Sequence, residues 1–163
     1  MEKFILASVM LFSFISFSLG FSEEVVDRVI AYVDNYAITL KEFIVFSKKM
    51  KENFSDMKNE EILETMINRI LLIKKAEEYF AGLPEEELIN NYIELKIKST
   101  IIISEDKVRN YYESNKDKFK NIPYISIREE IEKYLFEKEL NKKLKEHIKE
   151  LRESTEIKII FIP

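Results

Sequence analysis

The scarcity of glycine is the feature that most limits what this chain can fold into. Its 163 residues include two glycines and three prolines, and Gly20 lies in an apolar stretch at the N-terminus. Loops that wrap a phosphate group, and most tight turns in active sites, use glycine where the backbone turns left-handed or approaches a ligand closely. With Gly82 as the one other glycine, the sequence predicts long helices joined by short polar connections.

Apolar residues recur at helical spacing through several segments, and polar residues mark where the helices begin. Thr39 with Glu42 three positions later is typical of a capping box, as is Ser126 with Glu129. Ser104 predicts a further N-cap. The expected helices cover, approximately, residues 39–54, 60–80, 84–97, 104–116 and 126–153.

Segments rich in β-branched residues stand at both ends of this helical region. Residues 25–33 and 156–162 predict strands, and residues 36–38 predict a short return strand after a turn at Asp34 and Asn35. Two isolated strands would leave open hydrogen-bonding edges. We therefore expect the two terminal strands to pair, in a mainly α fold with a small antiparallel sheet (α+β).

The first twenty residues have the organisation of a secretory signal peptide. A polar start is followed by an uncharged run from Phe4 to Leu19, and Gly20 suits a cleavage site before Phe21. Retention of the segment as a membrane anchor is the alternative, because its length is near the lower limit for a span. We expect a cleaved signal and a periplasmic protein, with residues 21–163 forming one domain.

Composition excludes several classes of function. The net charge is −4, the pI is about 5.3 and both signs of charge are interspersed, which is unlike the clustered basic face of a nucleic-acid-binding protein. The chain has no cysteine and one histidine, His147. A lone histidine at the edge of an apolar stripe is usually a packed or surface side chain, so we expect no catalytic residue and no cofactor. We also expect no metal site, and a site formed by carboxylates alone is the alternative.

The order of these segments resembles the SurA-type periplasmic chaperones and related exported peptidyl-prolyl isomerases. The resemblance is carried by VDRVIAYVDNYAITLKEF (26–43), ILETMINRILLIKKA (62–76), ISEDKVRNYYESNKDKF (103–119) and the closing segment at 125–160. It implies an N-terminal helical part at 25–119 and a long helix with a closing strand at 125–163. In isomerase members a parvulin domain separates the last two segments, but here Phe119 and Ser126 are too close to hold one. The resemblance thus implies a chaperone that is not an enzyme.

The candidate binding residues are aromatic and methionine side chains on the first long helix and just after it. They are Phe43, Phe46, Met50, Phe54 and Met57. Flexible side chains of this kind suit promiscuous binding of extended apolar segments, although a role in the core is the alternative for each of them.

These observations predict an ATP-independent holdase that binds unfolded exported or outer-membrane proteins in an apolar cleft. We expect a monomer or homodimer with no membrane span in the mature form and no nucleic-acid partner. The alternative is a non-catalytic helical adaptor for one dedicated envelope partner, which an uncleaved N-terminal segment would tether to the membrane.

Overall fold

The computed structural model describes residues 27–120 and 122–163. The expected signal peptide (1–20) and the first two residues of the expected strand at 25–33 lie outside this part. The elements are β1 (Val29–Val33), β2 (Tyr36–Thr39), α1 (Leu40–Asn53), α2 (Asn59–Glu77), α3 (Glu85–Lys96), α4 (Glu105–Ser114), α5 (Tyr124–Glu153) and β3 (Ile157–Ile159). Short 3₁₀ turns follow α3 at Lys98–Thr100 and α4 at Lys116–Phe119. The predicted fold class, mainly helical with a small antiparallel sheet, is confirmed.

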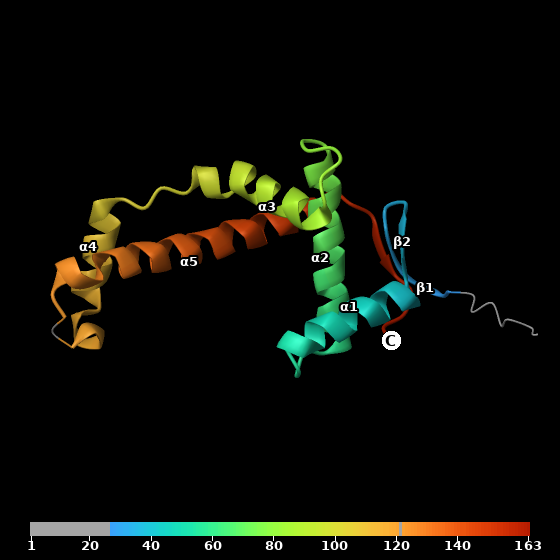
Figure 1. The fold of residues 1–163 in the computed structure, drawn as a ribbon, viewed down its shortest axis with the longest axis horizontal. Helices are drawn as coiled ribbons and strands as arrows, with labels where there is room; N and C mark the ends of the chain where they lie inside the picture. Colours follow the sequence, from blue (N-terminus) through green and yellow to red (C-terminus); the bar gives the residue numbers. More distant parts are fainter. Residues whose placement is uncertain (1–26, 121) are drawn as a thin grey trace, which may run out of the picture.

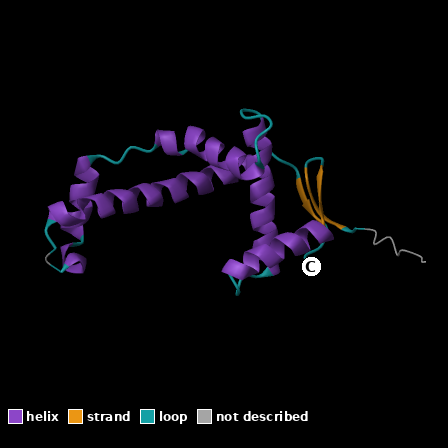
Figure 2. Cartoon of the chain, viewed as in Figure 1, coloured by secondary structure: helices purple, strands orange, loops and turns teal. Residues whose placement is uncertain are grey.

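The molecule is elongated along α5, as Figure 1 shows. The sheet, α1 and α2 gather at the C-terminal end of α5, whereas α4 packs on its N-terminal part at the far end. Figure 2 shows that all three strands lie together beside α1 and α2. Within the described residues no helix is both long and apolar enough to cross a bilayer.

The two ends of the described chain are joined in the sheet, as the sequence predicts. The strand order is β2-β1-β3, and β3 pairs antiparallel with β1 so that Tyr32 lies opposite Lys158. β3 is shorter than the expected strand at 156–162. Pairing β1 with β3 therefore closes the part of the fold that carries the main core.

A β-bulge changes which side chains of β1 are buried. The register between β1 and β2 shifts between Val29 and Ala31, and the extra residue, Ile30, is completely buried while Tyr32 is exposed. Simple alternation along a strand would place Ile30 and Tyr32 on one face, but the structure buries Ile30 and exposes Tyr32. The bulge rotates Ile30 inward, and its carbonyl accepts hydrogen bonds from the N–H groups of Ile160 and Phe161.

The turn between β1 and β2 links three parts of the fold. Asp34 adopts a left-handed backbone conformation (φ 51°), which aspartate tolerates better than most residues. Its carboxylate accepts hydrogen bonds from Lys74 of α2 and from the backbone N–H of Glu156. The hairpin, α2 and the beginning of β3 are thereby held at one point.

The main core forms where α2 meets the sheet and its neighbouring helices. α2 is the centre of this core, because eight of its residues are buried. The buried residues around it come from β1, β2, α1, α3 and the end of α5, with Ile30, Ile38, Phe43, Tyr92 and Leu151 among them. α2 can therefore present only its remaining side to solvent.

The structure confirms two predicted helix starts and corrects a third. Thr39 forms the expected capping box with Glu42, and the Ser104 side chain caps α4. Ser126 does not cap α5, which begins at Tyr124 with Pro123 as the N-cap. Proline fits there because the first residues of a helix need no intrahelical N–H donor, so the helix begins before Ser126 is reached.

A second, smaller cluster of aromatic residues holds α4 against α5. Tyr112 stacks on Phe119 with ring centroids 5.5 Å apart, and Tyr111 approaches Tyr134 of α5 with a centroid separation of 5.3 Å. Because α4 packs on the N-terminal part of α5, it lies far from the sheet. The two ends of α5 therefore contact different parts of the fold.

Candidate functional site

An open groove runs between α1 and α2 on the side where β2 and the beginning of α3 also approach. It consists of three hollows. The first, of about 750 Å³, is bounded by β2, α1, α2 and the start of α3. The second, of about 590 Å³, continues between α1, α2 and α3. The third, of about 620 Å³, lies at the end of α1 and the connection to α2.

Shared residues make the three hollows one continuous surface. Phe46, Lys49 and Arg69 border both the first and the second hollow. Met50 and Thr65 border both the second and the third. The groove thus extends along α2 from Glu77 to Glu61, which corresponds to about 24 Å at the helical rise of about 1.5 Å per residue.

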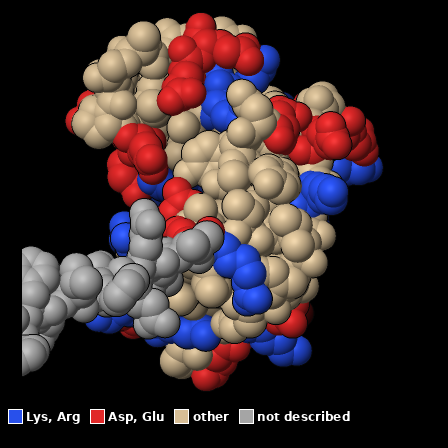
Figure 3. All heavy atoms as spheres, turned by 90° about the vertical axis from the view of Figure 1, so that its right-hand side faces the viewer, with Lys and Arg blue, Asp and Glu red and all other residues tan. Residues whose placement is uncertain are grey.

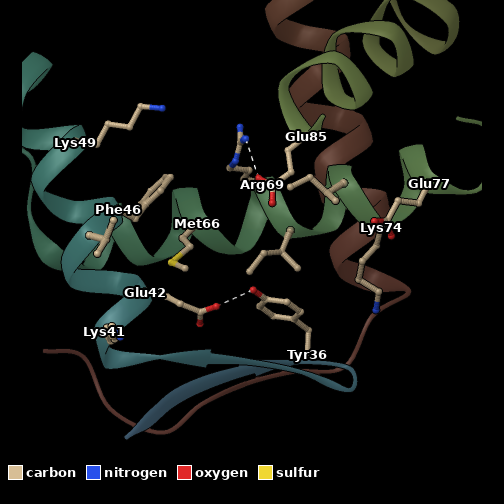
Figure 4. A pocket seen from close by; sticks show the side chains of 13 residues that line it. Tyr36, Lys41, Glu42, Phe46, Lys49, Met66, Arg69, Lys74, Glu77 and Glu85 are labelled. Carbon is tan, nitrogen blue, oxygen red and sulfur yellow. Dashed lines mark hydrogen bonds and ion pairs between the residues drawn. The ribbon is translucent and has the colours of Figure 1, made fainter. Parts of the chain in front are cut away.

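The floor of the first hollow is apolar and its borders carry both signs of charge. Side chains of Val45 and Phe46 from α1 and of Met66, Ile70 and Ile73 from α2 form the apolar surface. In Figure 4 helix α1 and strand β2 border the hollow, and the side chains of Phe46 and Met66 lie beside it. Lys41, Lys49, Lys74, Glu42, Glu77 and Glu85 supply the charges around it.

Two polar contacts fix the borders of the first hollow. Tyr36 of β2 donates a hydrogen bond to Glu42 Oε1 at 3.0 Å, and partial burial, followed by the Glu42 carboxylate, raises the pKa of the Tyr36 hydroxyl. On the α3 side, Arg69 pairs with Glu85 at 3.1 Å and with Glu86 at 3.2 Å. These contacts hold β2 to α1 and α3 to α2, so the groove is preformed.

The structure separates the five predicted binding residues. Phe46 and Met50 are half-buried, and their side chains pack against the core while also bordering the groove. Phe54 is 60% exposed, and it borders the third hollow together with the half-buried Met57.

Phe43 is the exception, and its prediction as a binding residue is corrected. It is 3% exposed and belongs to the core. It lies on the face of α1 that docks on α2 and the sheet, so it cannot reach a ligand in the groove.

Several groove residues were not singled out from the sequence. Val45 is 67% exposed and borders the first hollow, and its signal was an apolar residue outside the buried stripe of α1. Met66, Ile70 and Ile73 belong to the wide apolar face of α2. That width was the signal, because one edge of the face serves the core and the other lines the groove.

His147 takes part in packing at a different place. Its Nε2 lies 2.8 Å from the hydroxyl of Tyr92, joining α5 to α3. Tyr92 is 1% exposed, and burial, with minor contributions from Tyr79 and Glu78, raises the pKa of its hydroxyl to about 12. This geometry gives His147 a structural contact. Across residues 27–120 and 122–163, histidine, aspartate and glutamate side chains form no group of three arranged to hold a metal ion.

Comparisons with protein-family models, with curated proteins and with solved structures found no match to this chain. The resemblance to the SurA-type chaperones therefore stays a prediction.

Proposed function

We propose that this protein is an ATP-independent holdase chaperone of the bacterial envelope that shelters unfolded exported or outer-membrane proteins. Its groove between α1 and α2 binds extended apolar segments of these clients and keeps them from aggregating. Binding involves no bond chemistry, and a client leaves when its own folding competes successfully with a weak complex.

The chemistry of the groove supports binding without a strict sequence requirement. Its floor combines Phe46, Met50 and Met66 with branched aliphatic residues. Unbranched thioether side chains adapt to differently shaped partners, and surfaces of this type are characteristic of promiscuous binders. Charges of both signs around the groove accommodate the polar residues that separate apolar ones in a client.

The length of the groove sets the size of the bound segment. An extended chain advances by about 3.3 Å per residue, so about seven residues fit along the groove, which spans about 24 Å of α2. This matches most of a transmembrane β-strand, which needs about 9–11 residues. Unfolded outer-membrane barrels, whose strands alternate apolar and polar residues, are therefore the client class we propose.

The observation that carries the proposal is the exposure of apolar residues along this groove, above all Val45 and Phe54. At 67% and 60% exposure, these side chains contribute little to the core. A soluble protein that keeps such residues beside a preformed hollow has a surface suited to an apolar partner.

The test measures how well the protein suppresses aggregation of an unfolded outer-membrane barrel and of two unrelated unfolded proteins. The variant is Val45→Ser with Phe54→Ser, and the matched control is Ile102→Ser, which removes an 81% exposed apolar side chain that borders none of the three groove hollows. Wild type and control should protect all three clients at near-stoichiometric ratio, whereas the groove variant should protect them weakly.

Protection of no client by the wild-type protein, with one protein co-purifying from envelope extracts, would contradict the proposal and support the adaptor. An assay of cis/trans isomerisation in a proline-containing peptide tests whether the protein is an isomerase. The proposal predicts that the protein does not accelerate isomerisation above its uncatalysed rate.

A further inference from the structure

The outer edge of β3 presents backbone hydrogen-bonding groups that point away from the sheet. Asp34 N–H donates to the Glu156 carbonyl at 2.7 Å, and Ile160 N–H donates to the Ile30 carbonyl at 2.8 Å. Backbone groups alternate in direction along an antiparallel strand. Because the backbone groups of Glu156 and Ile160 point toward β1, the backbone N–H and C=O groups of Ile157 and Ile159 point away from the sheet.

The residues around this edge favour pairing with another strand. β3 and the residues after it read Ile-Lys-Ile-Ile-Phe-Ile, which combines high β-propensity with a single charge. Ile159, Ile160 and Ile162 are all exposed. Natural proteins usually protect such an edge from pairing with other strands by several charges, a proline or a covering segment. Within β3 itself, Lys158 is the one charged residue.

We propose that β3 pairs antiparallel with β3 of a second copy of this chain, making one continuous six-stranded sheet across a homodimer. The two-fold axis passes between Ile157 and Ile157 of the second copy. These two residues exchange both of their outward backbone hydrogen bonds.

Charge complementarity selects both the second copy as the occupant and this register. Glu156 and Lys158 flank Ile157, are exposed, and have no ion-pair partner among the described residues. With Ile157 at the axis, Glu156 lies directly opposite Lys158 of the second copy, and the symmetry forms this pair twice. A shift by one residue places Lys158 opposite Lys158, which is unfavourable.

The position of β3 in the sheet makes this interface compatible with an open groove. β3 and β2 are the two outer strands, and the groove is bordered by Tyr36 of β2. In Figure 4 the C-terminal segment follows the side of the hairpin away from the hollow. Figure 3 shows the sheet end of the molecule, where uncharged atoms form a broad central area with charges around it. Pairing at β3 therefore leaves both grooves free.

The test uses sedimentation equilibrium on the mature chain from low to high micromolar concentration, with charge-reversal variants. Wild type should show a concentration-dependent dimer. Glu156→Lys alone and Lys158→Glu alone should each weaken the dimer by about tenfold or more, because both symmetric pairs become repulsive. The double variant, Glu156→Lys with Lys158→Glu, should restore dimerisation.

Mixing the two single variants gives the most specific outcome. A chain with lysine at both positions and a chain with glutamate at both positions should form a heterodimer, although each dimerises poorly alone. Circular dichroism and melting curves serve as controls at low concentrations, where wild type is also monomeric, and the surface changes should leave both unaltered there.

A wild type that stays monomeric throughout the range would overturn the proposal. So would a dimer that survives Glu156→Lys, because another register or another surface would then form it. If β3 variants changed client binding by a monomer, the edge would belong to clients and the proposal would be wrong.

Discussion

Two phenylalanines, Phe43 in α1 and Phe54 directly after its last residue, separate folding from binding. Phe43 is 3% exposed and packs in the main core, whereas Phe54, the C-cap residue that follows α1, is 60% exposed beside the groove. The same substitution at both positions removes the same atoms. The difference between the two variants therefore depends on location alone.

Phe43→Ala should lower the free energy of unfolding by about 3–5 kcal/mol, the usual cost of removing a buried aromatic ring. Phe54→Ala should change it by no more than about 0.5 kcal/mol. With a urea m-value of about 2 kcal/mol per molar, the midpoint of unfolding falls by about 2 M for Phe43→Ala and stays almost unchanged for Phe54→Ala.

The binding assay should give the opposite order when both variants are compared under conditions in which they are folded. Phe54→Ala should lose part of the aggregation suppression, while folded Phe43→Ala should retain it. Equal destabilisation by the two substitutions would refute the assigned burial. Full suppression by Phe54→Ala would refute the assignment of its side chain to the binding surface.

Three further substitutions test how the elements are held. Thr39→Ala removes the N-cap of α1 and should lower the free energy of unfolding by about 1 kcal/mol in urea titrations, with Thr39→Ser close to wild type. The hydrogen bond from Lys74 lowers the pKa of Asp34 below 3.8, so this carboxylate stabilises the fold above the unfolded pKa and loses its contribution as pH falls through the folded value. Asp34→Asn should accordingly destabilise at neutral pH, and its difference from wild type should vanish in strong acid. Phe161→Asp places a charge on a side chain that packs against the core and should lower the melting temperature; an unchanged melting curve would show that the terminal segment does not tie the fold.

Local signals in the sequence were sufficient for most of the fold. Thr39 with Glu42 and Ser104 mark helix starts because capping is a contact within one turn. The pairing of β1 with β3 followed from the need to satisfy two strand edges. Gly82 lies between α2 and α3 with a φ of 78°, a conformation that glycine adopts without strain.

The predictions from sequence are wrong where tertiary contacts determine the ends of a helix or the register of a strand. Whether α5 begins at Tyr124 or at Ser126 depends on which of two acceptable starts the chain uses, and Tyr124 donates a hydrogen bond to Glu105 of α4 that holds the earlier start in place. α2 ends at Glu77, ahead of the expected Phe80. No glycine lies near the bulge at Ile30, so the sequence carries no local signal that predicts it.

The sequence predicted that the candidate site is an apolar surface on the first long helix, but it identified only some of the residues that form this surface. An excess of apolar residues on α1 indicated that some would remain exposed. Which residue turns inward depends on how α1 docks against α2 and the sheet, so Phe43 was assigned to the wrong side. Val45 lies outside the buried stripe of α1, which indicated an exposed apolar residue, but its place beside the groove depends on that docking.

A single fluorescent label beside the groove between α1 and α2 can report whether this groove receives unfolded polypeptide. Because the chain has no cysteine, Val45→Cys and Ile102→Cys each provide one labelling site. Position 45 borders the groove, whereas position 102 borders none of its three hollows. Titration with an unfolded outer-membrane barrel should shift the emission of the label at position 45 to the blue with saturation, and leave that at position 102 unchanged. A response at position 102 alone, or at neither position while aggregation is still suppressed, would contradict the account.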